Sequence, residues 1–527
     1  MLAAAGSRGS LRRTDGIPWF SAGRRPLTPF TPPGRRLSGE GFVLYVQHMT
    51  RPSGLAACLA LALAVSPRDS NAQSLSASDS ALVGRILLAE DRRDATDASL
   101  AAGGAHGDAR VRAIAQRAAG RIGDPPFTSR AALPPLRPPP IWVEPAWRIR
   151  YRALANMRDD CMALRLAASD SAWPVRFRAA ALVRESCARD EELVQSFARW
   201  IREIPHDVRT RARGDVAWQG AANALVALAR IRPEEARWSL AQFVGDPDWH
   251  LRQYAARAAG TLGDTLVLRT LAADRDDNVA EAAIAALSRL TGHADDALFL
   301  AAIERRGAQV VRAAAMALKG SPRSDAAPAA ARVFDRWVAR ANASAHDARV
   351  ALLEAAGRPA SDDRPPTVVA VLPRDAVALA LGKEITLRVW MGSERGGGRF
   401  DVRLRGDVAP MMAARILALV RERYYDGLTW HRVEHDFVIQ GGSPGANEYV
   451  GLPQFLRDEL GSVTHARGTL GMSTRGHDTG DAQWFVNLRD NARLDRDYTV
   501  WGEIIAGMDV VDGVLEGDRI QRIRVLR

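Results

Sequence analysis

Residues 430–442 read "WHRVEHDFVIQGG", which places His431 and Arg432 ahead of an apolar stretch that ends in Gln440 and two glycines. The run from Leu428 to Gln440 is rich in β-branched and aromatic residues and predicts a buried strand. The arginine is therefore either a solvated residue at the edge of a sheet or a functional residue of a site.

The residues around this stretch predict a β-rich domain. Residues 383–407, "KEITLRVWMGSERGGGRFDVRLRGD", read as two strands joined by a glycine loop, and an amphipathic helix follows from Pro410 to Tyr424. The glycine run lacks the Lys-Ser/Thr of a phosphate-binding loop, which favours a hairpin. Further strands are expected at 469–473, 483–488, 499–505 and 519–526. Many antiparallel strands with one or two helices suggest a closed barrel.

Five blocks between residues 385 and 527 resemble the cyclophilin-type peptidyl-prolyl cis-trans isomerases. They are "FDVRLRGDVAP", "YYDGLTWHRVEHDFVIQGG", "GTLGMS", "AQWFVNL" and "LDRDYTVWGEI", in this order and spacing. The resemblance implies a closed antiparallel eight-stranded barrel with two helices, with the active surface on one outer face.

The resemblance also implies a set of site residues. Arg432 matches the catalytic arginine of the family, and Gln440 matches the glutamine that orients it. The substrate groove and proline pocket are expected to contain Phe437, Val438, Met472, Ser473, Gln483, Phe485, Leu494 and Tyr498. The chemistry of the family needs neither a cofactor nor a metal. His431 and His435 are four residues apart, but on an extended segment this spacing does not direct two imidazoles at one metal ion.

Several positions depart from the common pattern of the family, among them Arg415 and Ile416, which stand where the family commonly has Asn-Phe. Arg493 stands where many members have a tryptophan or another aromatic residue that contacts cyclosporin, and Tyr498 replaces a histidine. Tyrosine is common at the position of Tyr498 in bacterial-type members. We therefore expect activity with weak sensitivity to cyclosporin.

Residues 73–360 contain a degenerate helical repeat. "DARVRAIAQRAAGRIGD" (108–124) and "DWHLRQYAARAAGTLGD" (248–264) share a central Arg-Ala-Ala-Gly and a terminal Gly-Asp, and weaker copies start near Val175, Val279 and Val310. This pattern resembles HEAT-type repeats and predicts an α-solenoid of helical hairpins, although an alanine-rich helical domain without superhelical order is an alternative. An aspartate can cap the second helix of a unit, and the arginine after Val/Leu can lie over the preceding unit.

Proline-rich segments separate the predicted parts of the chain. An insertion at 125–147 interrupts the helical array, because proline cannot continue a helix. The residue pattern changes from helical to alternating after "GRPASDDRPPT" (357–367). We therefore expect a linker at 361–379 and the isomerase domain at 380–527.

The N-terminal segment resembles a targeting signal that is removed from the mature protein. Residues 49–72 have a short start with Arg51, an apolar run too short to span a bilayer and a small-residue site at Ser70–Ala72, which is typical of a secretory signal peptide. Residues 1–48 would then be a non-native or disordered leader, and the protein would be exported, periplasmic or secreted. A lipoprotein anchored through Cys58, or a cytosolic protein with a disordered leader, are alternatives.

The charge of the chain, its apolar segments and its cysteines limit what the protein is expected to bind and where it can be cross-linked. The net charge of the chain is +11, but residues 1–72 carry more than half of it and no basic run is interleaved with aromatic residues, so nucleic-acid binding has weak support. No segment reaches transmembrane length, so we expect no stable membrane insertion. Cys161 and Cys187 could form a disulfide or lie in the core as small hydrophobes.

Together these features predict a bacterial peptidyl-prolyl cis-trans isomerase that assists the folding of exported proteins. Its partners would be proline-containing polypeptides, with a protein partner on the surface of the solenoid. A scaffold or chaperone that only binds proline-containing segments is the alternative.

Overall fold

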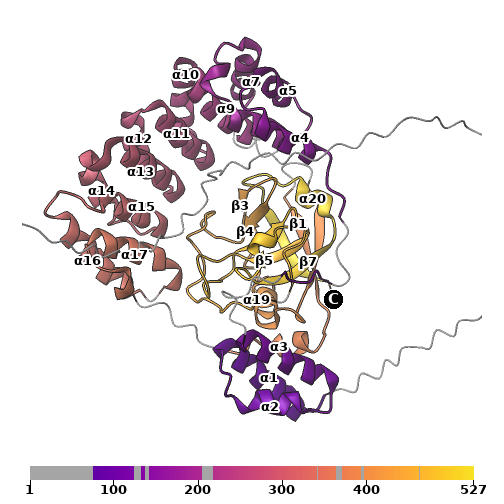
Figure 1. Ribbon diagram of the computed structural model, residues 1–527. Coiled ribbons are helices and arrows are strands. Elements are labelled where there is room, and N and C mark those ends of the chain that lie inside the picture. The colour runs from indigo at the N-terminus through magenta and orange to yellow at the C-terminus, as the bar shows by residue number, and fades with distance from the viewer. Residues whose placement is uncertain are drawn as a thin grey trace, which may run out of the picture. The chain divides into compact units, whose positions relative to one another are not determined.

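The computed structural model describes residues 75–123, 132–136, 142–204, 218–340, 342–363, 371–392, 397–461 and 463–526. The predicted leader, the signal peptide with Cys58, and parts of the proline-rich insertion and the linker lie outside these residues. The described chain consists of helices followed by a β-rich part (Figure 1). None of its helices is both long and apolar enough to cross a membrane.

The C-terminal part is built around one antiparallel sheet of eight strands. The strands are β1 (Thr386–Met391), β2 (Arg399–Leu404), β3 (Trp430–Val433), β4 (Val438–Gly441), β5 (Thr469–Met472), β6 (Trp484–Asn487), β7 (Val500–Ala506) and β8 (Ile520–Val525). Their order in the sheet is β3-β4-β6-β5-β7-β2-β1-β8. Three helices accompany the sheet: α18 (Ala376–Ala380), α19 (Pro410–Arg421) and α20 (Met508–Asp512).

The end strands β3 and β8 are linked without a continuous ladder. The Trp430 N–H donates to the Asp518 carbonyl at 2.9 Å, the Ile520 N–H donates to the Leu428 carbonyl at 2.7 Å, and Thr429 and Arg519 form an isolated bridge. The predicted closed barrel is therefore an eight-stranded sheet whose ends meet through the residues that flank the strands. The predicted helix at 410–424 ends earlier, at Arg421.

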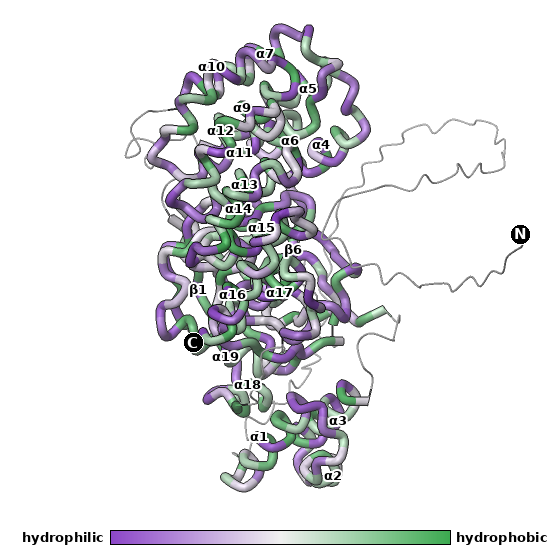
Figure 2. The backbone as a smooth tube through the Cα atoms, turned by 90° about the vertical axis from the view of Figure 1, so that its left-hand side faces the viewer, coloured by the Kyte–Doolittle hydropathy of each residue, from purple (hydrophilic) through white to green (hydrophobic). Residues whose placement is uncertain are grey.

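A helical array, defined here as α4 to α17, precedes the sheet. Its helices are α4 (Trp147–Ala153), α5 (Cys161–Ala168), α6 (Trp173–Leu182), α7 (Glu191–Arg202), α9 (Trp218–Ile231), α10 (Pro233–Val244), α11 (Trp249–Leu262), α12 (Thr265–Ala272), α13 (Asp277–Thr291), α14 (Asp296–Ala302), α15 (Ala308–Leu318), α16 (Ala326–Val338) and α17 (His346–Ala355). The helices α9, α11, α13, α15 and α17 contact one another in succession, and each also packs on a neighbour from the second row (Figure 1). Hydrophobic and hydrophilic residues are interspersed along each helix (Figure 2).

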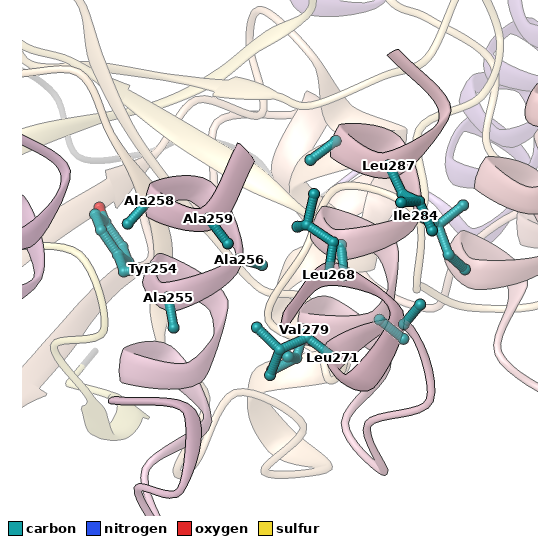
Figure 3. Close-up of a cluster of buried hydrophobic side chains, with 14 of the residues drawn as sticks. Tyr254, Ala255, Ala256, Ala258, Ala259, Leu268, Leu271, Val279, Ile284 and Leu287 are labelled. Carbon is teal, nitrogen blue, oxygen red and sulfur yellow. The ribbon is translucent and has the colours of Figure 1, made fainter. Parts of the chain in front are cut away.

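Small residues allow close packing in the array. Ala256 and Ala259 of α11 point toward Leu268 of α12 and Val279 of α13 (Figure 3). All four side chains are buried in one hydrophobic cluster that runs through the array. Alanine at these positions lets neighbouring helices approach closely, as the sequence pattern predicts.

Side chains at the turns confirm one expectation about the repeat and correct another. Asp248 and Asp276 cap α11 and α13, where each carboxylate accepts a backbone N–H of its own helix. Arg252 pairs with Asp274 at 2.7 Å, which lies in the following unit. Arg252 also donates to the carbonyls of Asp246 and Pro247, so at this copy the arginine bridges the turn before its own helix and the next unit rather than the preceding unit.

Cys161 and Cys187 form a disulfide that joins the start of α5 to η2 (Glu185–Cys187). The bond spans 26 residues and encloses α6. Cys187 is also buried in the cluster of the array, so the bond lies in a packed environment.

The first three helices, α1 (Ala77–Arg92), α2 (Ala98–Gly104) and α3 (Ala109–Gly123), pack against the C-terminal part. Side chains of α1 and α3 belong to the same hydrophobic cluster as the interior of the sheet. Arg117 and Arg121 of α3 hold the buried carboxylate of Glu90 and also donate to the carbonyls of Asp407 and Val408. These contacts join the N-terminal helices to the loop before α19.

Candidate active site

Arg432 and Gln440 face each other across the β3–β4 hairpin. A tight turn separates the two strands, because the Phe437 N–H donates to the Glu434 carbonyl at 2.7 Å. This turn pairs Arg432 with Gln440 in the register of the hairpin, and Arg432 Nη1 lies 3.5 Å from Gln440 Oε1. The predicted single strand from Leu428 to Gln440 is therefore two strands, and the fold back brings the two residues together.

A chain of amides fixes Gln440. Its Nε2 donates to Gln483 Oε1 at 3.2 Å, and Gln483 Nε2 donates to the carbonyls of Glu448 and Val450, each at 3.2 Å. Both glutamines are nearly fully buried. Because every amide group in this chain has a partner, the orientation of Gln440 beside Arg432 is well determined.

Glu448 is a site residue that the sequence did not reveal. Its Oε1 lies 3.0 Å from Arg432 Nη1, and Glu434 Oε1 lies 3.8 Å from Arg432 Nε. Glu448 belongs to the loop 443–451, which has no strand or helix periodicity and no block that the family resemblance uses. The side chain of Arg432 is a quarter exposed, so it remains accessible from solvent beside these carboxylates.

An apolar cluster lies beside Arg432 on the outer face of the sheet. Val438, Phe485 and Leu494 are buried together, and Phe437 and Tyr498 pack against them. Side chains alternate across a sheet, so the neighbours Ile439 and Val486 point into the interior cluster instead. The two strands thus separate this outer apolar cluster from the core.

His465 supports the apolar cluster from below. Its ring stacks on Phe485 with the centroids 5.7 Å apart. Its Nδ1 accepts from Asn487 Nδ2 at 3.1 Å, which leaves Nε2 to donate to the Tyr498 carbonyl at 3.1 Å. Burial lowers the pKa of His465 to about 4, so the ring is neutral near pH 7.

Gly471 allows Phe485 to lie flat against the sheet. A Cβ atom at this position would stand 2.2 Å from the Phe485 ring, which no side chain tolerates. At the rim, the Arg493 guanidinium lies over the Phe437 ring, 4.0 Å from its centroid. A cation thus covers one side of the apolar cluster.

The structure brings together most of the predicted site residues. Arg432, Gln440 and Gln483 form the polar side, and the apolar side consists of Phe437, Val438, Phe485, Leu494 and Tyr498. Ser473 lies beside Gln483 in the backbone ladder, where its N–H donates to the Gln483 main-chain carbonyl at 2.8 Å. Met472 does not join the pocket, because its side chain is buried in the interior cluster of the sheet.

The two histidines of the hairpin lie in different surroundings. Burial and the neighbouring Arg432 lower the pKa of His431 to about 3. His435 packs instead among rings of the helical array, with Trp147 and Tyr151 centroids 6.0 and 6.1 Å away. Within the described ranges, no group of three or more His, Cys, Asp or Glu side chains is arranged to hold a metal ion.

Comparisons with known proteins identify the family of the C-terminal part. Residues 389–525 match the family described as "Cyclophilin type peptidyl-prolyl cis-trans isomerase/CLD". The chain is 33% identical over 131 residues to peptidyl-prolyl cis-trans isomerase B of Bacillus subtilis, which corresponds to 24% of this chain and 92% of the relative. It is 34% identical over 119 residues to a peptidyl-prolyl cis-trans isomerase of Helicobacter pylori (22% of this chain, 73% of the relative). It is also 34% identical over 118 residues to the isomerase ppi1 of Schizosaccharomyces pombe (21% and 76%).

An eight-stranded antiparallel sheet that carries this outer apolar cluster, together with relatives matched over most of their length, defines the class. The chain belongs to the cyclophilin-type peptidyl-prolyl cis-trans isomerases. Its isomerase part is the C-terminal quarter, and the helices before residue 389 have no counterpart in this match.

Proposed function

We propose that Arg432 is the catalytic residue and that Gln440 positions it. The observation that carries this proposal is their pairing across the hairpin, with the arginine directed to the edge of the apolar cluster of Val438 and Phe485. Phe437, Leu494 and Tyr498 would complete a pocket for the proline ring of a polypeptide.

The chemistry follows from the amide bond. Rotation about an Xaa-Pro bond breaks amide resonance and has a barrier of roughly 18–20 kcal/mol. In the twisted state the proline nitrogen becomes pyramidal and regains a lone pair, so a fixed cationic donor stabilises that state more than the planar ones. Arginine suits this task because it stays protonated and carries several donors in a rigid fork. The apolar cluster excludes water and strengthens the hydrogen bond.

Substitution of the two polar residues tests this assignment. In a protease-coupled assay on an Xaa-Pro tetrapeptide, Arg432→Ala should lower kcat/KM by about 100-fold or more, the usual loss when one donor to the transition state is removed. Gln440→Leu should lower kcat by about tenfold with little change in KM, because it acts only through the arginine. Arg421→Ala, which removes an arginine on α19 that pairs with Asp375, is the matched control. Equal rates for Arg432→Ala and wild type would reject catalysis and favour a scaffold that only binds proline-containing segments.

The helical array is proposed as a HEAT-type platform that binds polypeptide clients. Its support is the regular succession of α9, α11, α13, α15 and α17 and the direct contacts of this row with loops of the isomerase part. Hydrogen–deuterium exchange with a permanently unfolded polypeptide should show added protection in peptides of α11 to α17. Protection confined to residues 380–527 would contradict a platform.

Export is proposed from the predicted signal at 49–72. The Cys161–Cys187 disulfide supports it, because such bonds persist in oxidising compartments. N-terminal sequencing of the mature protein from a bacterial host should find a start just after Ala72 in the periplasmic fraction. A lipid-modified Cys58 at the N-terminus would favour the anchored alternative, and an unprocessed cytosolic chain would contradict both.

A further inference from the structure

A second cavity lies between the helical array and the isomerase part. It has a volume of about 560 Å³, within the range of ligand sites in proteins. One wall consists of the first residues of α13 and α15 with Trp249 and Trp337, and the opposite wall is the loop 444–451. None of the site residues predicted from the sequence lines it.

The array holds this loop by specific bonds. Asn278 Nδ2 donates to the Gly445 carbonyl at 3.0 Å, and Asn447 Nδ2 donates to Asn278 Oδ1 at 2.9 Å. Arg475 bridges the loop to the segment before α17, because it donates to the carbonyls of Glu448 and Ser344 at 2.6 and 3.1 Å. These hydrogen bonds therefore hold the two walls of the cavity in fixed positions.

One polar group in the lining has no partner among the residues that the structure describes. Gln309 is 3% exposed, and no described residue donates a hydrogen bond to its Oε1. A buried acceptor without a donor costs on the order of 1–3 kcal/mol, which a bound N–H group would recover. Trp249, Trp337 and Tyr449 supply aromatic surface in the same cavity.

The charges of the lining narrow the chemistry of the ligand. Arg275 and Arg306 stand beside Asp276 and Asp277, so the two signs balance. Asp277 is moreover paired with Arg305 at 2.6 Å. The lining thus presents both signs side by side, with Asp277 already engaged by an arginine, and offers no carboxylate or guanidinium cluster for a strongly charged ligand. A peptide segment, neutral along its backbone, with N–H donors and apolar side chains, fits an amide acceptor flanked by aromatic rings.

We infer that this cavity is a second binding site for an extended segment of the same polypeptide whose proline occupies the pocket beside Arg432. A backbone N–H of the segment donates to Gln309 Oε1, and its apolar side chains pack on Trp249, Trp337 and Tyr449. This inference rests on the proposed function, because it needs a polypeptide substrate at the arginine.

The two sites share one thin wall. Glu448 carries the carboxylate that pairs with Arg432, and the next residue, Tyr449, lines the cavity. Consecutive Cα atoms are about 3.8 Å apart. A chain that leaves the proline pocket past this loop therefore reaches the cavity within a few residues, and the cavity adds affinity for long substrates by raising the effective concentration of the proline at the pocket.

The test uses the full-length protein with two substrates and a competitor. The substrates are an Xaa-Pro tetrapeptide and a denatured protein whose refolding is limited by proline isomerisation, and the competitor is a proline-free unfolded polypeptide. The competitor should inhibit isomerisation of the long substrate and leave turnover of the tetrapeptide unchanged. Equal inhibition of both reactions would place the competitor at the proline pocket and overturn the inference.

Two substitutions locate the second site. Gln309→Leu removes the acceptor at nearly constant volume, and Ala308→Phe fills the cavity from the start of α15. Each should lower the ratio of kcat/KM for the long substrate to that for the tetrapeptide by five- to tenfold and weaken the competitor. Gln195→Leu on α7, an exposed position far along the chain, should keep the wild-type ratio. An unchanged ratio in both cavity variants would overturn the inference, whereas loss of tetrapeptide turnover in Arg432→Ala alone concerns the proposed function.

Discussion

Arg432 is ion-paired with Glu448 across 3.0 Å, so a carboxylate of the protein already occupies one branch of the guanidinium. A substrate carbonyl that binds this arginine has to compete with Glu448. Half-exposed pairs of this kind contribute about 0.2–1 kcal/mol. Glu448→Gln should therefore raise kcat/KM for a tetrapeptide by roughly two- to fivefold, and added salt should stimulate the wild type more than the variant. A threefold fall would show that Glu448 positions the arginine instead.

Arg493 predicts a weak response to cyclosporin. Its guanidinium covers Phe437 at 4.0 Å, where an aromatic residue in other members of the family contacts the drug. Inhibition of the wild type should need micromolar drug, and Arg493→Trp should lower the inhibitory concentration by at least tenfold. Nanomolar inhibition of the wild type would contradict this prediction.

His465 makes the stability of the pocket depend on pH. The folded pKa of about 4 lies below the usual 6.5, so between these values the folded protein binds fewer protons than the unfolded chain. The stabilisation is complete above pH 6.5 and is lost as the pH falls toward 4. His465→Gln lowers the free energy of unfolding. This decrease should thus be about 3 kcal/mol larger at pH 7.5 than at pH 4. Urea unfolding of both proteins at the two pH values measures it, and a pH-independent difference would mean that the histidine titrates normally.

The Cys161–Cys187 disulfide should stabilise the start of the helical array. A cross-link over 26 residues lowers the entropy of the unfolded chain and contributes about 3 kcal/mol. The double variant Cys161→Ser/Cys187→Ser should unfold at lower urea concentration in the array, with tetrapeptide turnover retained. Alkylation of the denatured, unreduced protein counts free thiols, and modification of Cys161 would show that the bond does not form.

The β-rich part could be predicted from the sequence in more detail than the site. Alternating residues located the strands near 386–391 and 500–506, but the same pattern merged β3 and β4, because the turn at Glu434–Phe437 contains neither glycine nor proline. The pairing of Arg432 with Gln440 was reached through the family resemblance, since an extended strand would have put them far apart.

Other features depend on contacts between distant segments. Glu448 lies in an irregular loop, and its position beside Arg432 is set by Asn278 of α13, 170 residues earlier in the chain. No local sequence pattern predicts such a contact. Met472 was assigned to the groove by its block, whereas the alternation of β5 turns its side chain into the core with Leu470.

The packing of α1 and α3 into the hydrophobic cluster of the sheet has a consequence for the synthesis of this protein. Val83 and Ile86 of α1 are made first, yet Ala376 and Leu379 of α18, the helix that α1 contacts, leave the ribosome some 290 residues later. At roughly 5–20 residues per second this interval lasts tens of seconds. Through that time the apolar faces of α1 and α3 lack the rest of their cluster, which leaves them open to a chaperone.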